Sequence, residues 1–374
     1  MRIKINIVTY FAFIILSIAQ SNKIDLQKRS CSTFTFSGSD TLIVGHNLDD
    51  YIDVPGCIVV NSRGVKKNNI TWVEIINPSI TPIKFEWVSK YGSITYNTMG
   101  REYIDGGLNE AGLYIGEMTL FETKYPVNDT IPKIYHNLWL QYILDNFATV
   151  DEVLENLSKV LIDGHCQWHF FLIDKTGKAA VIEFLDGKTI IYSDEQLPVK
   201  VLCNRKYSAE LDTLNVYKDF LKEENPDFDK ISCLNRFVWT EKMIRDFQSK
   251  TSQSIIDYGL LMLKRLDCEN NKWSVLYDVK NMRLYFNTYL SRKIKYVDFS
   301  KFDFSCSDTI KYFDIHTDIS GDVSDRFENL ADSINESYVK KTWDNIDLGE
   351  YANLYFKPTL IKKLSDHTKS FRCN

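Results

Sequence analysis

The stretch that decides the fold is Cys31-Ser-Thr-Phe-Thr-Phe-Ser-Gly-Ser-Asp-Thr-Leu-Ile-Val-Gly-His-Asn-Leu-Asp49. Residues 33–36 alternate Thr with Phe, and residues 41–44 form a second run that is typical of a strand. Residues 37–40 between them are rich in turn formers. The pattern predicts a β-hairpin at this point of the chain.

The hairpin brings a thiol close to a carboxyl group. When the chain folds back at Gly38 and its neighbour, Cys31 comes to lie opposite residues near His46 and Asn47. Asp49 lies just beyond them, at the same open end. The spacing therefore predicts that a nucleophile and an acid share one edge of a sheet.

Up to about residue 300 the chain is interpreted as one domain in which strands and helices do not alternate. Helices are expected at 132–160 (two), 209–223, 234–248 and 252–266, and strands at 169–174, 180–185, 189–192, 199–203, 273–278 and 284–289. This segregation favours antiparallel sheets covered by helices, an α+β fold, over a doubly wound parallel sheet. The pattern weakens from about residue 301, where one more helix is expected at 325–343.

The composition is that of a folded protein with a large core. Of the 374 residues, 44% are apolar and 13% are aromatic, which is enough for one big domain or two ordinary ones. The net charge of -5 comes from interspersed acids and bases, and no basic track is visible. We therefore expect no nucleic-acid partner.

The N-terminus has the pattern of a signal peptide. Two basic residues precede an almost wholly apolar run over 5–18, which is short for a membrane span. Ser17 and Ala19 have the spacing that a signal peptidase recognises, so residues 1–19 are the predicted signal peptide, with cleavage after Ser21 as the second choice. The mature protein is then secreted or periplasmic and has no membrane partner. An uncleaved membrane anchor is the alternative.

Eight cysteines are scattered along the chain, without a CxxC motif or a Cys/His spacing typical of metal sites. We therefore expect neither a zinc site nor an iron–sulfur site. If Cys31 is a free thiol, seven cysteines remain, and a fully paired disulfide framework is excluded.

Several blocks of the chain form one ordered set. They are Cys31-Ser-Thr-Phe, Gly45-His-Asn-Leu-Asp49, Asp105-Gly-Gly-Leu-Asn-Glu-Ala-Gly-Leu113, His169 to Phe184, Leu202-Cys-Asn204, Arg236-Phe-Val238, and Trp273 to Asp278 with Tyr285 to Thr288. Together they resemble the signatures of the choloylglycine hydrolase and penicillin V acylase family, which are linear amide hydrolases of the N-terminal-nucleophile superfamily. The resemblance extends from Cys31 to about residue 299.

This resemblance implies a four-layer αββα sandwich over residues 31–300, in which two antiparallel sheets lie between helical layers. It also implies that Cys31 is the nucleophile and that a propeptide, residues 20–30, is removed to expose it. Residues 301–374 are then a C-terminal extension without an assigned role.

The chemistry expected of Cys31 follows from its position. A thiol on the first residue of a mature chain has its own base, because a free α-amino group titrates near pH 8. Asp49 is expected to orient that amine; its plainer interpretation is an acid that closes a turn. No metal or organic cofactor is implied. The residues around Cys31 lack the setting of a papain-like thiol protease.

Four more residues are candidates for the site. Asn204 resembles the family's oxyanion-hole residue. An amide NH2 suits that role because it donates hydrogen bonds without titrating; the plainer interpretation is an Asn that caps a turn. Arg236 resembles the arginine that the family places near the nucleophile, where a cation favours the thiolate; otherwise it forms a surface ion pair. His46 stands where the family commonly carries arginine, and Thr119 where it often shows Asn or Tyr. Both are expected to line the substrate site.

The sequence therefore predicts a secreted hydrolase of linear amide carbon–nitrogen bonds that acts on a small-molecule N-acyl amide. Bile-salt-like and penicillin-V-like substrates and other N-acyl amides remain open, as does assembly into a homo-oligomer. Acyl transfer through the same thioester is an alternative. A non-catalytic secreted binding protein, in which Cys31 is never exposed as the first residue, is the alternative from another class.

Overall fold

The computed structural model describes residues 31–38, 40–77, 79–224, 227, 235–249, 254–267, 270–306 and 309–374. The predicted signal peptide (1–19) and propeptide (20–30) lie outside the described residues. Within the described ranges, no helix combines the length and apolar character needed to cross a bilayer.

The first large sheet has seven strands in the order β14-β1-β2-β15-β16-β17-β19. In chain order these are β1 (Ser32–Ser37), β2 (Leu42–Asp49), β14 (Val201–Leu202), β15 (Asn271–Asp278), β16 (Arg283–Thr288), β17 (Lys295–Asp298) and β19 (Gly321–Asp322). All neighbours run antiparallel except β17 and β19.

The second large sheet has nine strands in the order β13-β12-β11-β8-β7-β6-β3-β18-β20, and every neighbouring pair is antiparallel. Its strands are β3 (Cys57–Asn61), β6 (Ser93–Asn97), β7 (Gly106–Asn109), β8 (Tyr114–Thr119), β11 (Trp168–Ile173), β12 (Ala179–Leu185), β13 (Lys188–Ser193), β18 (Lys311–Asp314) and β20 (Glu328–Asn329). Two small sheets complete the set: β9 (Lys133–Tyr135) with β10 (Leu161–Asp163), and β21 (Arg372–Cys373) with β4 (Val65–Asn68) and β5 (Glu86–Val88).

The helices form the outer layers. They are α2 (Trp72–Ile76), α3 (His136–Asn146), α4 (Val150–Asn156), α5 (Tyr207–Val216), α6 (Arg236–Ser249), α7 (Ile255–Arg265), α8 (Asp332–Asp344) and α9 (Lys357–Lys369). Short helical turns are η2 (Leu157–Lys159), η3 (Asp194–Gln196), η4 (Phe220–Lys222), η7 (Phe299–Lys301), η8 (Ser324–Arg326) and the π-helical η9 (Ala352–Phe356).

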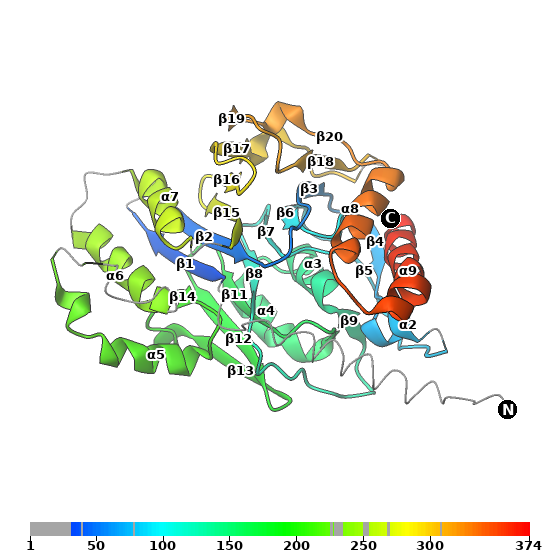
Figure 1. Ribbon diagram of the computed structural model, residues 1–374, viewed down its shortest axis with the longest axis horizontal. Helices are drawn as coiled ribbons and strands as arrows, with labels where there is room; N and C mark the ends of the chain where they lie inside the picture. The colour runs from blue at the N-terminus through cyan, green and yellow to red at the C-terminus, as the bar shows by residue number, and fades with distance from the viewer. Residues whose placement is uncertain are drawn as a thin grey trace.

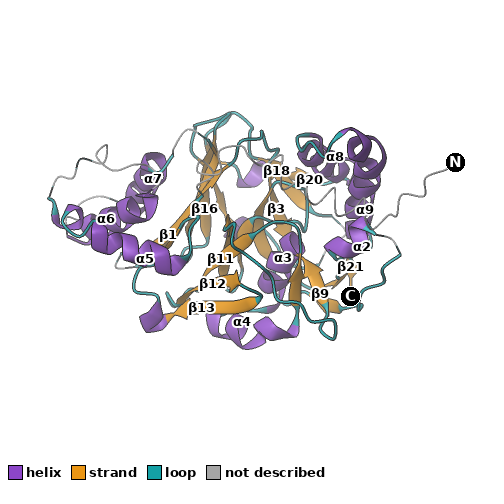
Figure 2. Cartoon of the chain, turned by 60° about the horizontal axis from the view of Figure 1, so that its bottom comes forward, coloured by secondary structure: helices purple, strands orange, loops and turns teal. Residues whose placement is uncertain are grey.

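The layers follow the order helix, sheet, sheet, helix. Helices α6 and α7 pack on the seven-stranded sheet, and α3 packs on β7 and β8 of the nine-stranded sheet. Figures 1 and 2 show the strands between α5–α7 on one side and α8 and α9 on the other. The expected α+β fold, an αββα sandwich with antiparallel sheets, is confirmed.

Adjacent residues of one strand contribute to two different cores. Phe170 and Phe171 are both fully buried in β11, but Phe171 belongs to the apolar cluster between the sheets and Phe170 to the cluster under the second helical layer. Successive side chains of a strand point to opposite faces, so this sheet is covered on both sides. Phe237 of α6 joins the first cluster, and Leu140 of α3 and Val339 of α8 join the second.

The hairpin predicted from the sequence is confirmed. Strands β1 and β2 pair antiparallel, with Ser32 opposite Asn47 and Phe34 opposite Gly45. A Cβ atom at Gly45 would lie 2.3 Å from the ring of Phe34, which is fully buried. The glycine is therefore required because the aromatic side chain of the opposite strand covers its position.

The C-terminal segment, residues 301–374, is built into the sandwich rather than appended to it. It supplies β18 to the nine-stranded sheet, and α8 and α9 to the second core. A disulfide joins Cys306 to Cys373, and β21 pairs with β4. The helix expected at 325–343 begins later, at Asp332, because η8 and β20 occupy the residues before it.

We predict that Gly45→Ala lowers the free energy of unfolding by about 1–3 kcal/mol, because the added methyl group overpacks the buried face of the hairpin. Gly38→Ala is the matched control, since its Cβ would meet Ile255 at an ordinary contact distance of 3.5 Å. Its effect should stay within about 0.5 kcal/mol. Denaturant unfolding of both variants measures the difference, and equal effects would refute the packing argument.

Candidate active site

Three strands of the seven-stranded sheet bring the expected site residues to one edge. Thr33 pairs with Leu202 in β14, so the register continues to place Cys31 opposite Asn204. On its other side β1 pairs with β2, whose last residue is Asp49. The start of β1 and the ends of β14 and β2 therefore meet.

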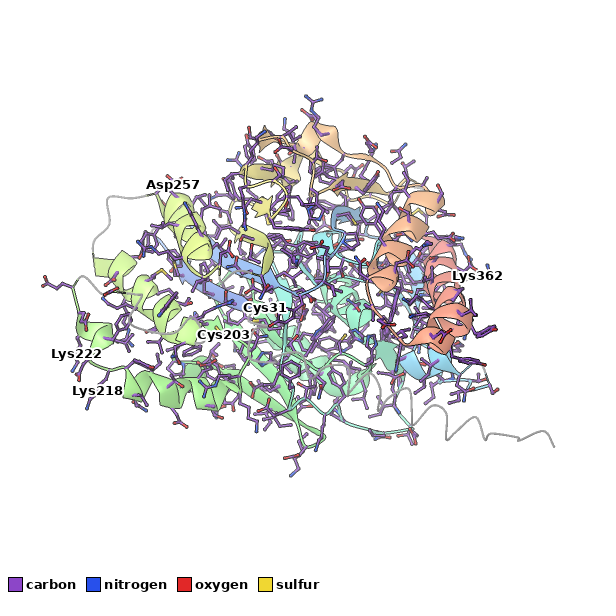
Figure 3. All side chains as sticks on the ribbon, in the orientation of Figure 1. Cys31, Cys203, Lys218, Lys222, Asp257 and Lys362 are labelled. Atoms are coloured by element: carbon purple, nitrogen blue, oxygen red, sulfur yellow. A yellow bond between two sulfur atoms is a disulfide. The ribbon has the colours of Figure 1, made fainter. Side chains whose placement is uncertain are left out.

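Cys31 is deeply buried, with 3% of its surface exposed. Its Sγ lies 3.9 Å from the backbone oxygen of Asp49, which accepts a hydrogen bond from the thiol. Burial raises the thiol pKa well above its ordinary value, and the charges of Glu117 and Asp49 raise it further. Figure 3 shows Cys31 near the middle of the molecule, with Cys203 labelled close by. Burial and the neighbouring acids thus favour the protonated thiol.

The carboxylate of Asp49 is held by two partners. Arg236, the first residue of α6, donates from Nη1 to Oδ2 at 2.5 Å, and both side chains are buried. Asn271 of β15 donates to Oδ1 at 3.2 Å. Burial raises the pKa of Asp49 to about 6, although the charge of Arg236 and the bond from Asn271 act to lower it. The structure thus pairs Arg236 with the carboxylate of Asp49, whose backbone oxygen accepts the hydrogen bond from Cys31.

Asn204 and Thr119 are brought into contact across the two sheets. Nδ2 of Asn204 donates to the backbone oxygen of Thr119 at 2.8 Å. Thr119 ends β8 of the nine-stranded sheet, and Asn204 follows β14 of the other. Oδ1 of Asn204 is buried without a hydrogen-bond partner among the described residues. The expected oxyanion-hole residue and one of the expected site-lining residues are thus neighbours.

His46 does not lie in the cavity, contrary to expectation. Its side chain is fully buried between the sheets, where Nδ1 lies 2.6 Å from the hydroxyl of Thr33 and the ring lies 5.5 Å from that of Tyr96. Burial lowers its pKa to about 3, so the imidazole is neutral. The reason is strand alternation, because His46 lies on the face of β2 that is covered by the second sheet.

A cavity of about 150 Å³ opens beside Cys31. Thr119 lines it, as do Trp343 and Ile346 of the C-terminal segment. The charged side chains among its lining residues are all acidic: Asp49, Asp50, Asp105 and Glu117. No lysine or arginine is among the described residues that line it.

The same wall contains a group that the sequence spacing did not indicate. His136, His165 and Cys166 line the cavity, and one donor atom of each lies within 4.8 Å of the other two. Burial lowers the pKa of His165 to about 4 and lowers that of His136 well below its usual range, so both rings are neutral. The only sequence signal for this group was the adjacent pair His165-Cys166. Two such residues do not indicate a site until folding brings His136 beside them.

By its layer order and by the position of its thiol at the start of β1, the molecule falls in the class of αββα amide hydrolases. Comparison with known proteins is consistent with this class. The profile of the linear amide C-N hydrolases, choloylglycine hydrolase family, matches residues 31–236, which is more than half of the chain. The chain therefore belongs to the choloylglycine hydrolase family and is a hydrolase of linear amide carbon–nitrogen bonds.

The individual relatives are named for the same enzymes as the family that the sequence resembles. The penicillin V acylase of Pectobacterium atrosepticum is 28% identical over 262 residues, covering 59% of this chain and 69% of the relative. The structure of penicillin V acylase from Agrobacterium tumefaciens aligns with a TM-score of 0.68 at 22% identity, covering 80% of this chain and 98% of that one. A variant of conjugated bile acid hydrolase from Clostridium perfringens aligns with a TM-score of 0.63 at 18% identity, covering 78% and 98%. The two structures support the fold.

We predict that Asp105→Asn flattens the pH dependence of stability. Burial raises the pKa of Asp105 to about 7, against hydrogen bonds from the backbone and hydroxyl of Thr98 that lower it. Between about pH 4 and pH 7 the folded chain holds a proton that the unfolded chain has lost, so the free energy of unfolding falls as the pH rises through this window. Across this pH window, the free energy of unfolding of the wild type should fall by up to about 4 kcal/mol more than that of the variant.

Denaturant unfolding at pH 4.5 and pH 7 measures this difference. Asp257→Asn is the control, because Asp257 is exposed at the start of α7 and should leave the pH dependence unchanged. Parallel stability curves for the wild type and Asp105→Asn would show that Asp105 is ionised throughout.

Proposed function

We propose that the protein is an exported N-terminal-nucleophile amidase in which Cys31, once it is the first residue, attacks the carbonyl carbon of a small N-acyl amide. The observation that carries the proposal is that Cys31, Asp49 and Thr119 line one cavity. Arg236 holds the carboxylate of Asp49, and Asn204 donates to the backbone oxygen of Thr119. Membership in a family of linear amide hydrolases supports the same reaction.

Activation of the sulfur requires a base that the uncleaved chain does not have. Burial and nearby acids hold the Cys31 thiol in its protonated form. Removal of residues 20–30 creates an α-amino group on the same residue, and such a group titrates near pH 8. It takes the thiol proton as the sulfur attacks. The buried Asp49–Arg236 pair lies beside this residue and fixes the acid that orients the new ammonium group.

The reaction then proceeds through two tetrahedral intermediates. A carbon–sulfur bond forms, and the carbonyl oxygen gains negative charge, which an N–H of Asn204 stabilises. An amide NH2 has two N–H groups, and the bond to Thr119 uses one. The carbon–nitrogen bond breaks as the ammonium proton passes to the leaving amine. Water then cleaves the thioester, which releases a carboxylic acid and restores the thiol.

The lining of the cavity favours a particular class of amide. The relatives are named for penicillin V and conjugated bile acids, which are acids. The charged side chains that line this cavity are also acidic, so they would repel such substrates. Asp49 is paired with Arg236, and burial raises the pKa of Asp105 to about 7, so Asp50 and Glu117 are the acids that an anionic group placed here would meet in a poorly solvated site. We therefore propose an amide that is neutral or cationic next to the scissile bond. A volume of about 150 Å³ admits a group of about one ring.

Export is part of the proposal and has two supports. The N-terminal residues have the pattern of a signal peptide. The disulfide between Cys306 and Cys373 is of a kind that persists in oxidising compartments.

We predict that the active protein, recovered from the medium or periplasm, begins at Cys31. Intact mass and N-terminal sequencing check this directly. Cys31→Ala should lower kcat/KM for an N-acyl amide at least roughly a thousandfold, because no covalent intermediate can form. Cys57→Ala, a buried thiol in β3 of the other sheet, is the matched control and should retain activity.

The same preparation separates the alternatives. A fully active chain that still carries residues ahead of Cys31 would refute the mechanism. A secreted chain that begins near Gln20, binds amides and turns over none is the binding protein. Product analysis in the presence of an added amine distinguishes the transferase, which forms a new amide faster than the free acid.

We predict a charge preference among substrates of equal size. In a series of N-acyl amides whose leaving amine carries a carboxylate, no charge or an ammonium group, kcat/KM should be at least tenfold lower for the carboxylate. Glu117→Gln should narrow that difference several-fold, because it removes one acidic charge from the cavity wall. Asp257→Asn, an exposed acid of α7, should leave the series unchanged. Preferential turnover of the carboxylate substrate would overturn the assignment of substrate class.

A further inference from the structure

Two parallel strands bring three metal-binding side chains to one place. Strands β9 and β10 run parallel and their last residues pair, so the chain leaves both strands at the same edge. His136 is the first residue after β9, and His165 and Cys166 follow shortly after β10. The pairing therefore places two imidazoles and a thiol together, although the sequence keeps them far apart.

The distances between the donor atoms are close to those of a site with a bound metal ion. One donor atom from each of the three side chains lies within 4.8 Å of the others, and the two imidazole rings lie 5.0 Å apart at a steep angle. Ligands of a tetrahedral zinc ion are separated by roughly 3.3–3.7 Å. A closure of about 1 Å, within the reach of side-chain rotation, completes the arrangement.

Each of the two imidazoles has one nitrogen without a hydrogen-bond partner among the described residues. His136 is 1% exposed, and its Nδ1 has no hydrogen-bond partner among the described residues; the same is true of Nδ1 of His165. Gly164 allows the close approach, since a Cβ atom there would lie 2.0 Å from Nδ1 of His136. Buried polar atoms in a native protein nearly always have a partner, and an ion is one way to supply it.

The chemistry of the set favours a borderline-soft cation. Two neutral imidazoles and a thiolate are ligands that zinc prefers, and three protein ligands leave the fourth position for water or a small ligand. All three side chains line the cavity that Cys31 also lines, and the acidic side chains of Asp50 and Glu117 in the same lining attract cations.

We propose that His136, His165 and Cys166 form a binding site for a zinc-type divalent cation in the wall of the cavity that contains Cys31. A cation and its water occupy part of a volume of only about 150 Å³. Zinc therefore competes with the substrate for the cavity; this consequence, unlike the site itself, rests on the proposed amidase function.

The test uses the full-length Cys31→Ser variant, so that neither amidase activity nor the Cys31 thiol enters the result. Titration with Zn²⁺ in a calorimeter should give one site per chain with a dissociation constant in the micromolar range or below. Co²⁺ should give the absorption of a tetrahedral ion with a thiolate-to-metal charge-transfer band. Adding Cys166→Ser should abolish that band, and adding His136→Ala or His165→Ala should weaken zinc binding at least tenfold.

The controls separate this site from other thiols and imidazoles. Cys57→Ala and His367→Gln, added in the same background, should leave the zinc affinity within about twofold, since neither side chain lines the cavity. An absence of saturable binding, or binding that survives all three ligand substitutions, would overturn the site.

A second measurement needs no ligand substitution. Cys166 is partly exposed, so iodoacetamide should label it in the folded protein, and peptide mapping reports the extent. Saturating Zn²⁺ should reduce that labelling at least tenfold and should be reversed by a chelator. Equal labelling of Cys166 with and without zinc would refute the proposal even if a histidine variant failed to fold.

Discussion

The register of β1 between β14 and β2 is the constraint on which the site depends. Thr33 pairs with Leu202 on one side, and Ser32 pairs with Asn47 on the other, so the first residue ahead of β1 is fixed between two strand ends. A slip of one residue would turn every side chain of β1 to the opposite face. The buried ring of Phe34 over Gly45 opposes such a slip, because no other position of β2 offers it the same space.

The electrostatics of the site favour the uncharged forms of its acidic groups. The interior raises the pKa of Cys31 and of Asp49, so a low-dielectric setting favours their neutral forms. Arg236 offsets the free-energy cost of burying the carboxylate of Asp49. Removing either partner would leave the other as an uncompensated buried charge. In the mechanism that we propose, a free α-amino group at Cys31 changes this balance by supplying a base next to the sulfur. The same burial that stabilises the fold thus opposes formation of the thiolate at Cys31.

Periodicity and spacing were enough to predict the hairpin and an α+β fold with antiparallel sheets, whereas the four layers required the family resemblance. The arithmetic of the hairpin placed Asp49 beside Cys31. Asn204 and Arg236 required the family resemblance, because an isolated Asn or Arg has many structural uses. His46 was misplaced, since the resemblance located it on β2 but not on the face that the second sheet covers. The cluster around His136 could not be predicted, because it depends on a parallel pair of three-residue strands that leaves no periodic signal.

The wall formed by Trp343 and Ile346 shows how this enzyme can diverge. These side chains reach the cavity from α8 and the loop that follows it, and Cys306–Cys373 ties their segment back to its own beginning. Mutations accumulating there alter the shape of the cavity while leaving Cys31 and its neighbours untouched. The cavity wall can thus change on one part of the polypeptide while the residues around Cys31 stay the same on another.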